Sequence, residues 1–185
     1  KESNVKGQRS KVIVSAGRLV PWKGFDVLIE IMKDLPDWKL VIVGDGPEYN
    51  TLKLEIGNWK LDKRVRLMGA VPRERLLELL AEASVFVLNT SFESFSYQVG
   101  EAMWARVPVI TTNIGNLAEI IDHNREGILV VPNNKSQILA AIRKLTEDQG
   151  FVSEVVKNAY EKAQHFSIEK TVDNLVNVIS HATTS

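Results

Sequence analysis

The sequence predicts an α/β fold: a Rossmann-like, doubly wound parallel sheet of about six strands with a C-terminal helical tail. Six short runs rich in Val and Ile are continuous rather than alternating, as in parallel strands covered on both faces. Helical patterns separate the runs, whose starts lie 20 to 28 residues apart, the length of a βα repeat. The expected strands are 12–14, 40–43, 65–68, 85–88, 107–111 and 128–131.

Apolar residues between these runs recur at helical spacing and predict one buried face per helix. The clearest faces are Phe25, Leu28, Ile29 and Met32, then Tyr49, Leu52 and Ile56, then Leu76, Leu77, Leu80 and Ala83. After the last run, three more helical patterns over 138–145, 151–160 and 168–179 form the predicted tail. Residues 1–10 are polar, and we interpret them as an interdomain linker remnant, which leaves 11–185 as one domain.

Composition excludes several functions. The 23 basic and 23 acidic side chains cancel, which argues against nucleic acid as the main partner. The chain has no Cys, so disulfides and thiol catalysis are excluded, and its three His lack metal-ligand spacing, so no metal site is expected. We find no run of 18 apolar residues and no apolar leader, and expect a cytoplasmic protein.

Ligands of an open parallel sheet bind beyond the carboxyl ends of its strands, so the loops after the runs are the candidate sites. The first loop holds Gly17 and two cations suited to phosphate, Arg18 and Lys23. Taken alone, these are equally well explained as solvated loop charges. A Gly-x-Gly-x-x-Gly motif is absent, which disfavours a nicotinamide or flavin dinucleotide.

The next two loops are glycine turns. Gly44 ends the second run, and Gly69 ends the third, two residues before Val71. A glycine there lets a ligand approach the backbone, and the small apolar segment at Val71 suits a nucleobase. Each loop alone is also an ordinary turn.

The fourth loop carries most of the chemistry. Glu93 follows the fourth run, and a helix is expected to begin near Ser96 or Tyr97, so that N–H groups around Gln98 point at an anion. Glu101 lies about one turn into this helix, where a carboxylate can accept bonds from sugar hydroxyls. The simpler alternative is a helix N-terminus with a favourable Glu nearby.

Together these motifs resemble the C-terminal half of a family 4 retaining glycosyltransferase of the GT-B type. The match runs from about residue 11 to 166. Its motifs, in order, are Gly17-Arg18-Leu19 with Lys23-Gly24, Val43-Gly44-Asp45-Gly46-Pro47, Gly69-Ala70-Val71, the pair Glu93 and Glu101, and Gly115-Asn116 with Glu119.

The resemblance implies the donor-binding domain of an enzyme that transfers a sugar from a UDP- or GDP-linked donor without a metal or other cofactor. By that resemblance Arg18 and Lys23 hold the diphosphate, and Glu93 contacts the transferred sugar, so these three are the catalytic candidates. Backbone N–H groups at Ser96, Tyr97 and Gln98 would bind phosphate or sugar oxygens. Glu101 would bind the ribose and Val71 would border the base, with Gly17, Gly44 and Gly69 lining the site.

The family pattern also implies partners. An N-terminal acceptor-binding domain would face this one, and any contact with the inner face of a membrane would be made through it. The isolated domain is then expected to bind donor and to transfer little sugar.

The sequence departs from the family pattern at four positions of the acidic motif and at one of the last loop. Ser96 stands where Gly is usual and Tyr97 where Leu or Ile is usual; Gln98 and Gly100 are also unusual, and Asn116 replaces a second Gly. The departure at Ser96 and Tyr97 leaves a non-catalytic nucleotide-sugar-binding module open as an alternative. A GT-B-like sugar-nucleotide epimerase is the other alternative, and the pair of Glu together with the Arg/Lys loop disfavours it. A flavodoxin-like or receiver domain is disfavoured because the first strand is followed by cations rather than acids.

Overall fold

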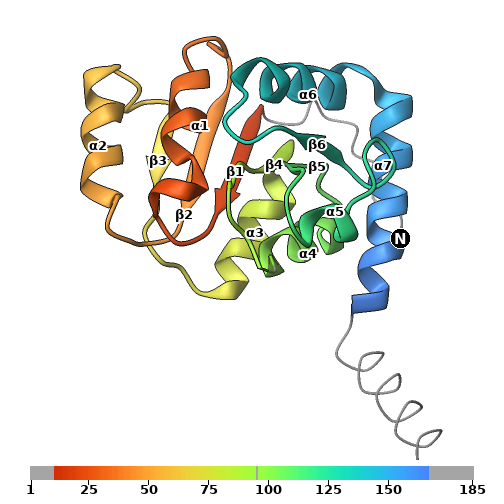
Figure 1. Ribbon diagram of the computed structural model, residues 1–185. Coiled ribbons are helices and arrows are strands. Elements are labelled where there is room, and N and C mark those ends of the chain that lie inside the picture. Colours follow the sequence, from red (N-terminus) through yellow and green to blue (C-terminus); the bar gives the residue numbers. More distant parts are fainter. Residues whose placement is uncertain (1–10, 95, 167–185) are drawn as a thin grey trace, which may run out of the picture.

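The computed structural model describes residues 11–94 and 96–166. Its elements follow one another as alternating strands and helices, and two α-helices and a short 3-10 helix follow the last strand of the described residues (Figure 1). In chain order they are β1 (Val12–Ala16), η1 (Pro21–Lys23), α1 (Phe25–Ile31), β2 (Lys39–Val43), α2 (Tyr49–Asn58), β3 (Val65–Leu67), α3 (Arg73–Glu82), β4 (Val85–Leu88), α4 (Tyr97–Trp104), β5 (Val109–Thr112), α5 (Leu117–Ile120), β6 (Ile128–Val130), α6 (Lys135–Glu147), α7 (Gln149–Ala163) and η2 (Gln164–Phe166).

The six strands form one sheet in the order β3-β2-β1-β4-β5-β6, and every pairing is parallel. In the centre, Ile13 of β1 lies opposite Leu40 of β2 on one side and Val85 of β4 on the other. The predicted fold class is therefore confirmed. Strand order reverses between β1 and β4, and this switch point is where open α/β sheets place their ligands.

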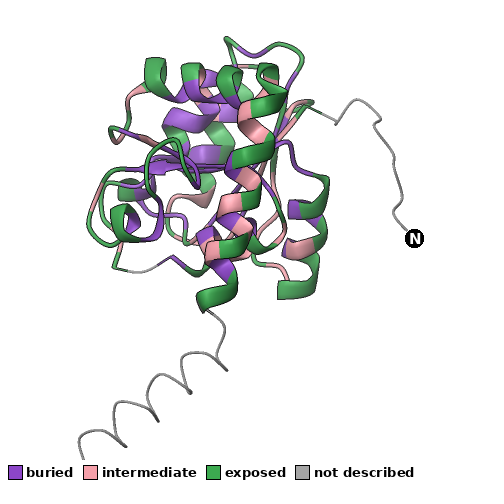
Figure 2. Ribbon diagram, turned by 90° about the vertical axis from the view of Figure 1, so that its right-hand side faces the viewer, coloured by how far each residue is buried: buried purple, intermediate pink, exposed green. Residues whose placement is uncertain are grey.

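Helices cover both faces of the sheet, which explains why its central strands are buried on both faces. All four residues of β4 are buried. One core cluster lies under α1, α2 and α6, and a second lies under α3, α4 and α5. Figure 2 shows this buried interior between exposed outer helix faces.

The helical tail begins as expected with α6 and α7. Helix α7 runs along the side of the sheet (Figure 1) and contributes to both cores, with Val155 in the first and Ala159 and Ala163 in the second. The third predicted tail helix, over 168–179, and the predicted linker, residues 1–10, lie outside the described residues. Within the described ranges, no helix has the length and apolar character needed to cross a membrane.

Candidate functional site

The three predicted glycine turns meet at the carboxyl edge of the sheet. The Gly17 N–H donates to the Val43 carbonyl (2.9 Å), and the Gly44 N–H donates to the Gly69 carbonyl (2.8 Å). A Cβ on Gly44, whose φ is 140°, would lie 1.8 Å from the Gly17 carbonyl oxygen. Only glycine permits this approach. The loops after β1, β2 and β3 therefore form one continuous backbone layer.

Lys23 and Glu93, 70 positions apart in sequence, form an ion pair above this layer. Their side chains are only 11% and 12% exposed. Lys23 ends the short helix η1, and the chain then turns through Gly24 in the left-handed conformation, at φ 56°. The Lys23 side chain lies against Gly17, since a Cβ there would be 3.7 Å from Lys23 Cε. The pair thus spans the loops after β1 and β4, at the switch point of the sheet.

Polar residues that follow β4 hold the backbone on both sides of Lys23. Asn89 is 1% exposed and donates to the Gly24 carbonyl (3.1 Å) and to Asn133 Oδ1 (2.9 Å). The Asn133 N–H returns a bond to Asn89 Oδ1 (2.8 Å). Thr90 and Ser91 both donate to the Trp22 carbonyl. Hydrogen bonds therefore join the loops after β1, β4 and β6 next to Lys23.

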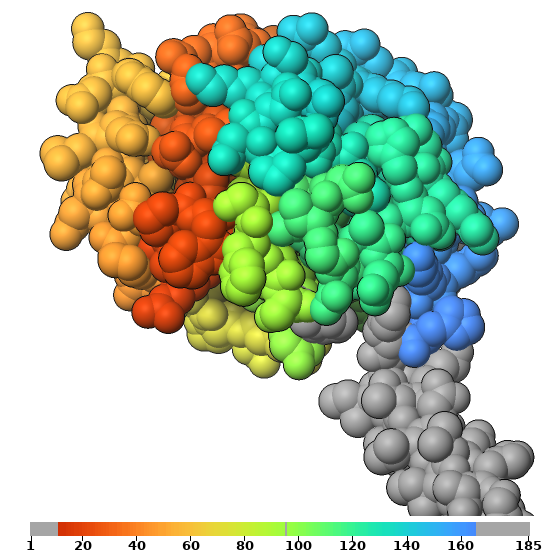
Figure 3. All heavy atoms as spheres, viewed as in Figure 1, coloured from red at the N-terminus to blue at the C-terminus, as the bar shows by residue number. Residues whose placement is uncertain are grey.

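The loop that follows β5 contacts the loop that carries Glu93. The Asn116 amide donates to the Ser94 carbonyl, and a Cβ on Gly115 would lie 3.2 Å from the Glu93 carbonyl oxygen. Figure 3 shows the segments near β1 (red), after β4 (light green) and around α5 (green) side by side on one face. The glycine loop predicted from the sequence thus supports the acidic motif rather than lying apart from it.

Helix α4 begins at Tyr97, as expected. Ser96 is buried and caps it, its Oγ accepting from the Val99 N–H at 3.4 Å. The N–H of Gln98 belongs to the first turn of α4, and the first turn of a helix is a favourable place for an anion. The Tyr97 side chain is 72% exposed. The serine that departs from the family pattern therefore has a structural role as an N-cap.

Glu101 is paired with a residue that the sequence analysis missed. Arg73 Nε donates to Glu101 Oε1 at 2.7 Å, with the glutamate side chain 16% exposed and the arginine 71% exposed. Arg73 opens α3, two residues after Val71, which is half-buried. Arg73 and Arg75 both lie in the first turn of α3, so the sequence pattern does not single out Arg73.

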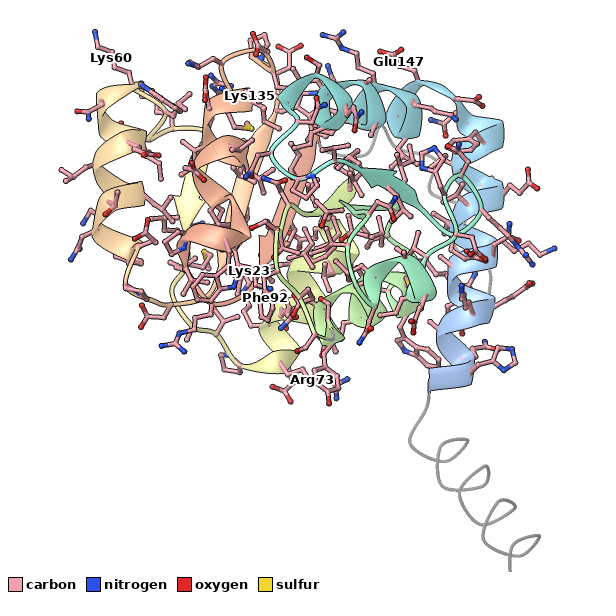
Figure 4. All side chains as sticks on the ribbon, viewed as in Figure 1. Lys23, Lys60, Arg73, Phe92, Lys135 and Glu147 are labelled. Atoms are coloured by element: carbon pink, nitrogen blue, oxygen red, sulfur yellow. The ribbon has the colours of Figure 1, made fainter. Side chains whose placement is uncertain are left out.

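The remaining predicted residue, Arg18, lies exposed between Gly17 and the buried Leu19. Figure 4 places Lys23 and Phe92 side by side near the middle of the view with Arg73 below them, and Lys135 and Glu147 near its top. Trp22 and Phe92, the neighbours of the ion pair in sequence, are 46% and 69% exposed. Exposed aromatic side chains thus flank the site.

The arrangement suits a ligand that is both anionic and hydroxylated. Lys23, Arg18 and the first turn of α4 offer positive charge and N–H donors, and Glu93 and Glu101 offer acceptors for hydroxyls. In the part of the chain that the structure describes, no group of three His, Cys, Asp or Glu side chains is placed to hold a metal ion.

Comparison with known proteins identifies the family. The model of "Glycosyl transferases group 1" matches residues 1–163. The chain is 33% identical over 175 residues to an uncharacterized glycosyltransferase, MJ1607, of Methanocaldococcus jannaschii, covering 91% of this chain and 45% of that protein. The chain belongs to the glycosyl transferases group 1 family.

Two solved structures of glycosyltransferase-type proteins have a similar fold. Anabaena Alr3699/HepE in complex with UDP superposes with a TM-score of 0.84 at 25% identity, over 94% of this chain and 49% of that one. The C-terminal domain of a group 1 glycosyl transferase, LpcC, from Francisella tularensis has a TM-score of 0.74 at 23% identity, over 88% of this chain and 93% of that one. The fold is one half of a GT-B fold, and the chain spans about half the length of the full-length proteins that it matches.

Proposed function

We propose that this chain binds the nucleotide-sugar donor of a retaining glycosyltransferase that works without a metal ion. The observation that carries the proposal is the Lys23–Glu93 pair at the switch point between β1 and β4. The pair places a cation that can bind phosphate beside a carboxylate that can accept bonds from hydroxyls. It lies at the edge where sheets of this kind bind nucleotides.

Each role follows from chemistry at this edge. Lys23 and Arg18 bind the diphosphate and stabilise the negative charge that develops on it as the sugar leaves. The first turn of α4 adds N–H donors to the same charge. Glu93 accepts from hydroxyls of the transferred sugar, Glu101 accepts from the ribose, and Val71 borders the base.

UDP is the first candidate for the nucleotide because Anabaena HepE was crystallised with it; GDP is the second. We further propose that a second domain, of the kind that makes the relatives about twice as long, holds the acceptor against the donor. Positioning of two reactants is among the largest contributions to enzymatic rate, and one domain supplies one wall of the cleft.

A titration series tests the donor site. Calorimetry and thermal shift are measured with UDP, GDP, ADP and UDP-glucose, and with uridine as the ligand that lacks phosphate. A ligand that binds only the folded chain raises its melting temperature. Tighter binding of one diphosphate than of its nucleoside supports the proposal, and a chain indifferent to all of them overturns it.

An assay of sugar transfer distinguishes the glycosyltransferase from the two alternative functions. Sugar transfer by the protein with both domains supports a glycosyltransferase. Donor binding without transfer to any acceptor supports a non-catalytic module, and interconversion of two nucleotide sugars supports an epimerase.

A further inference from the structure

Arg73 contacts Glu101, the residue assigned to the ribose, from a different element. It opens α3, and Glu101 lies within α4. The contact is a single bond of 2.7 Å from Nε to Oε1. Among the described residues it engages one carboxylate oxygen, Oε1, which leaves Oε2 for a ligand.

Stability alone does not explain this arginine. The pair joins a side chain that is 71% exposed to one that is 16% exposed, and pairs with an exposed partner contribute little to folding. The position is also unfavourable for a cation, because the first turn of a helix carries partial positive charge. Arg73 therefore acts against the dipole of its own helix while it restrains a carboxylate on another.

We infer that Arg73 is a positioning residue that fixes the Glu101 carboxylate for the ribose hydroxyls of the donor. The inference rests on the proposed function, since it assigns a role at the same site. A glutamate side chain held in one rotamer loses less freedom when it binds, so its bonds to the ligand contribute more to affinity.

The chain provides a matched control two residues away. Arg75 lies in the same first turn of α3 and pairs with Glu78 of its own helix through Nη1 (2.5 Å). Arg73→Met and Arg75→Met thus remove the same charge from the same helix end. Only the first releases Glu101.

The experiment compares dissociation constants for UDP and for 2′,3′-dideoxy-UDP in the two variants and in the unmodified chain. We expect Arg73→Met to weaken UDP three- to tenfold and the dideoxy nucleotide less than twofold. The preference for the ribonucleotide then shrinks. Arg75→Met leaves both constants unchanged within twofold, and the two variants have similar melting temperatures.

A double-mutant cycle isolates the route of the effect. In a Glu101→Gln background, Arg73→Met is expected to change UDP affinity by less than twofold, because the group that it positions is already altered. Two results would overturn the positioning role and leave the donor site intact. One is that Arg73→Met weakens UDP and dideoxy-UDP equally. The other is that Arg73→Met weakens UDP as much in the Glu101→Gln background as in the unmodified chain. No binding of UDP by the unmodified chain overturns the UDP site and this inference with it.

Discussion

Lys23 and Glu93 form an ion pair across the junction of the loops after β1 and β4, with both side chains nearly buried. Two charges shielded in this way are stable only as partners, because removing one leaves the other desolvated. A diphosphate entering the site brings new negative charge to Lys23. In the proposed function the phosphate would share the lysine with Glu93, and the glutamate would face the next group of the ligand, the sugar.

Loss of the cations should weaken diphosphate binding. We expect Lys23→Met and Arg18→Ala each to reduce UDP affinity at least tenfold, about 1.4 kcal/mol, because charge-assisted bonds to phosphate are lost. Affinity for uridine should hardly change. Calorimetry with both ligands measures the difference.

Lys135→Met is the control for Lys23. Lys135 also pairs with a glutamate of another element, Glu30 of α1, but its side chain is 45% exposed, and Figure 4 shows it well away from Lys23. This variant should bind UDP as the unmodified chain does. Unchanged UDP affinity in both Lys23→Met and Arg18→Ala would remove the phosphate site.

Glu101→Gln keeps the size of the side chain and one acceptor oxygen but loses the charge. We expect UDP to bind about tenfold more weakly and 2′,3′-dideoxy-UDP to be nearly unaffected, because the strong bonds to ribose hydroxyls are lost. Paired titrations give the two ratios. Equal losses for the two nucleotides would show that Glu101 acts through the structure of α4.

Glu55 of α2 makes the stability of the chain depend on pH. Burial raises the pKa of its carboxyl above 4.5, and the nearby charges of Asp26, Glu48 and Glu30 raise it further. Its Oε2 is buried and has no hydrogen-bond partner among the described residues. The Glu55 carboxyl therefore holds its proton more tightly in the folded chain than in the unfolded chain. The resulting stabilisation is fully present below the pKa of the unfolded chain and is lost as the pH rises through the pKa of the folded chain.

Glu55→Gln imitates the protonated form. We expect its melting temperature to exceed that of the unmodified chain at pH 7 and the gain to disappear well below pH 4.5, the ordinary pKa of the group. Asp26→Asn, which removes one repulsive neighbour, should give a smaller gain of the same sign. Thermal unfolding across pH checks this, and a gain independent of pH would mean that the charge is not its cause.

The sequence predicted the strands because period and composition determine which segments are buried on both faces, and every strand lies within two residues of its expected bounds. It also predicted that Lys23, Glu93 and the glycine turns lie at one edge of the sheet, since they follow strands whose carboxyl ends must share that edge. It could not predict which side chains pair. Arg73–Glu101 depends on how α3 packs beside α4, and the role of Asn89 depends on the meeting of three loops.

The last prediction concerns Glu93, whose proposed role is in sugar transfer more than in nucleotide binding. Glu93→Gln removes the carboxylate that shares Lys23, so the lysine is free for phosphate, and UDP affinity should stay the same or rise a few-fold. The bond to the donor sugar is weakened at the same time, and that bond is expected to matter most in the transition state, when charge develops on the sugar. In the protein with both domains, turnover should therefore fall at least tenfold while the dissociation constant of UDP does not rise.

Steady-state kinetics and calorimetry on the Glu93→Gln variant separate the two effects. Glu147→Gln, at the far end of α6, is the control that should change neither turnover nor UDP affinity. A parallel loss of UDP affinity and turnover would place Glu93 in nucleotide binding and contradict its assignment to the sugar.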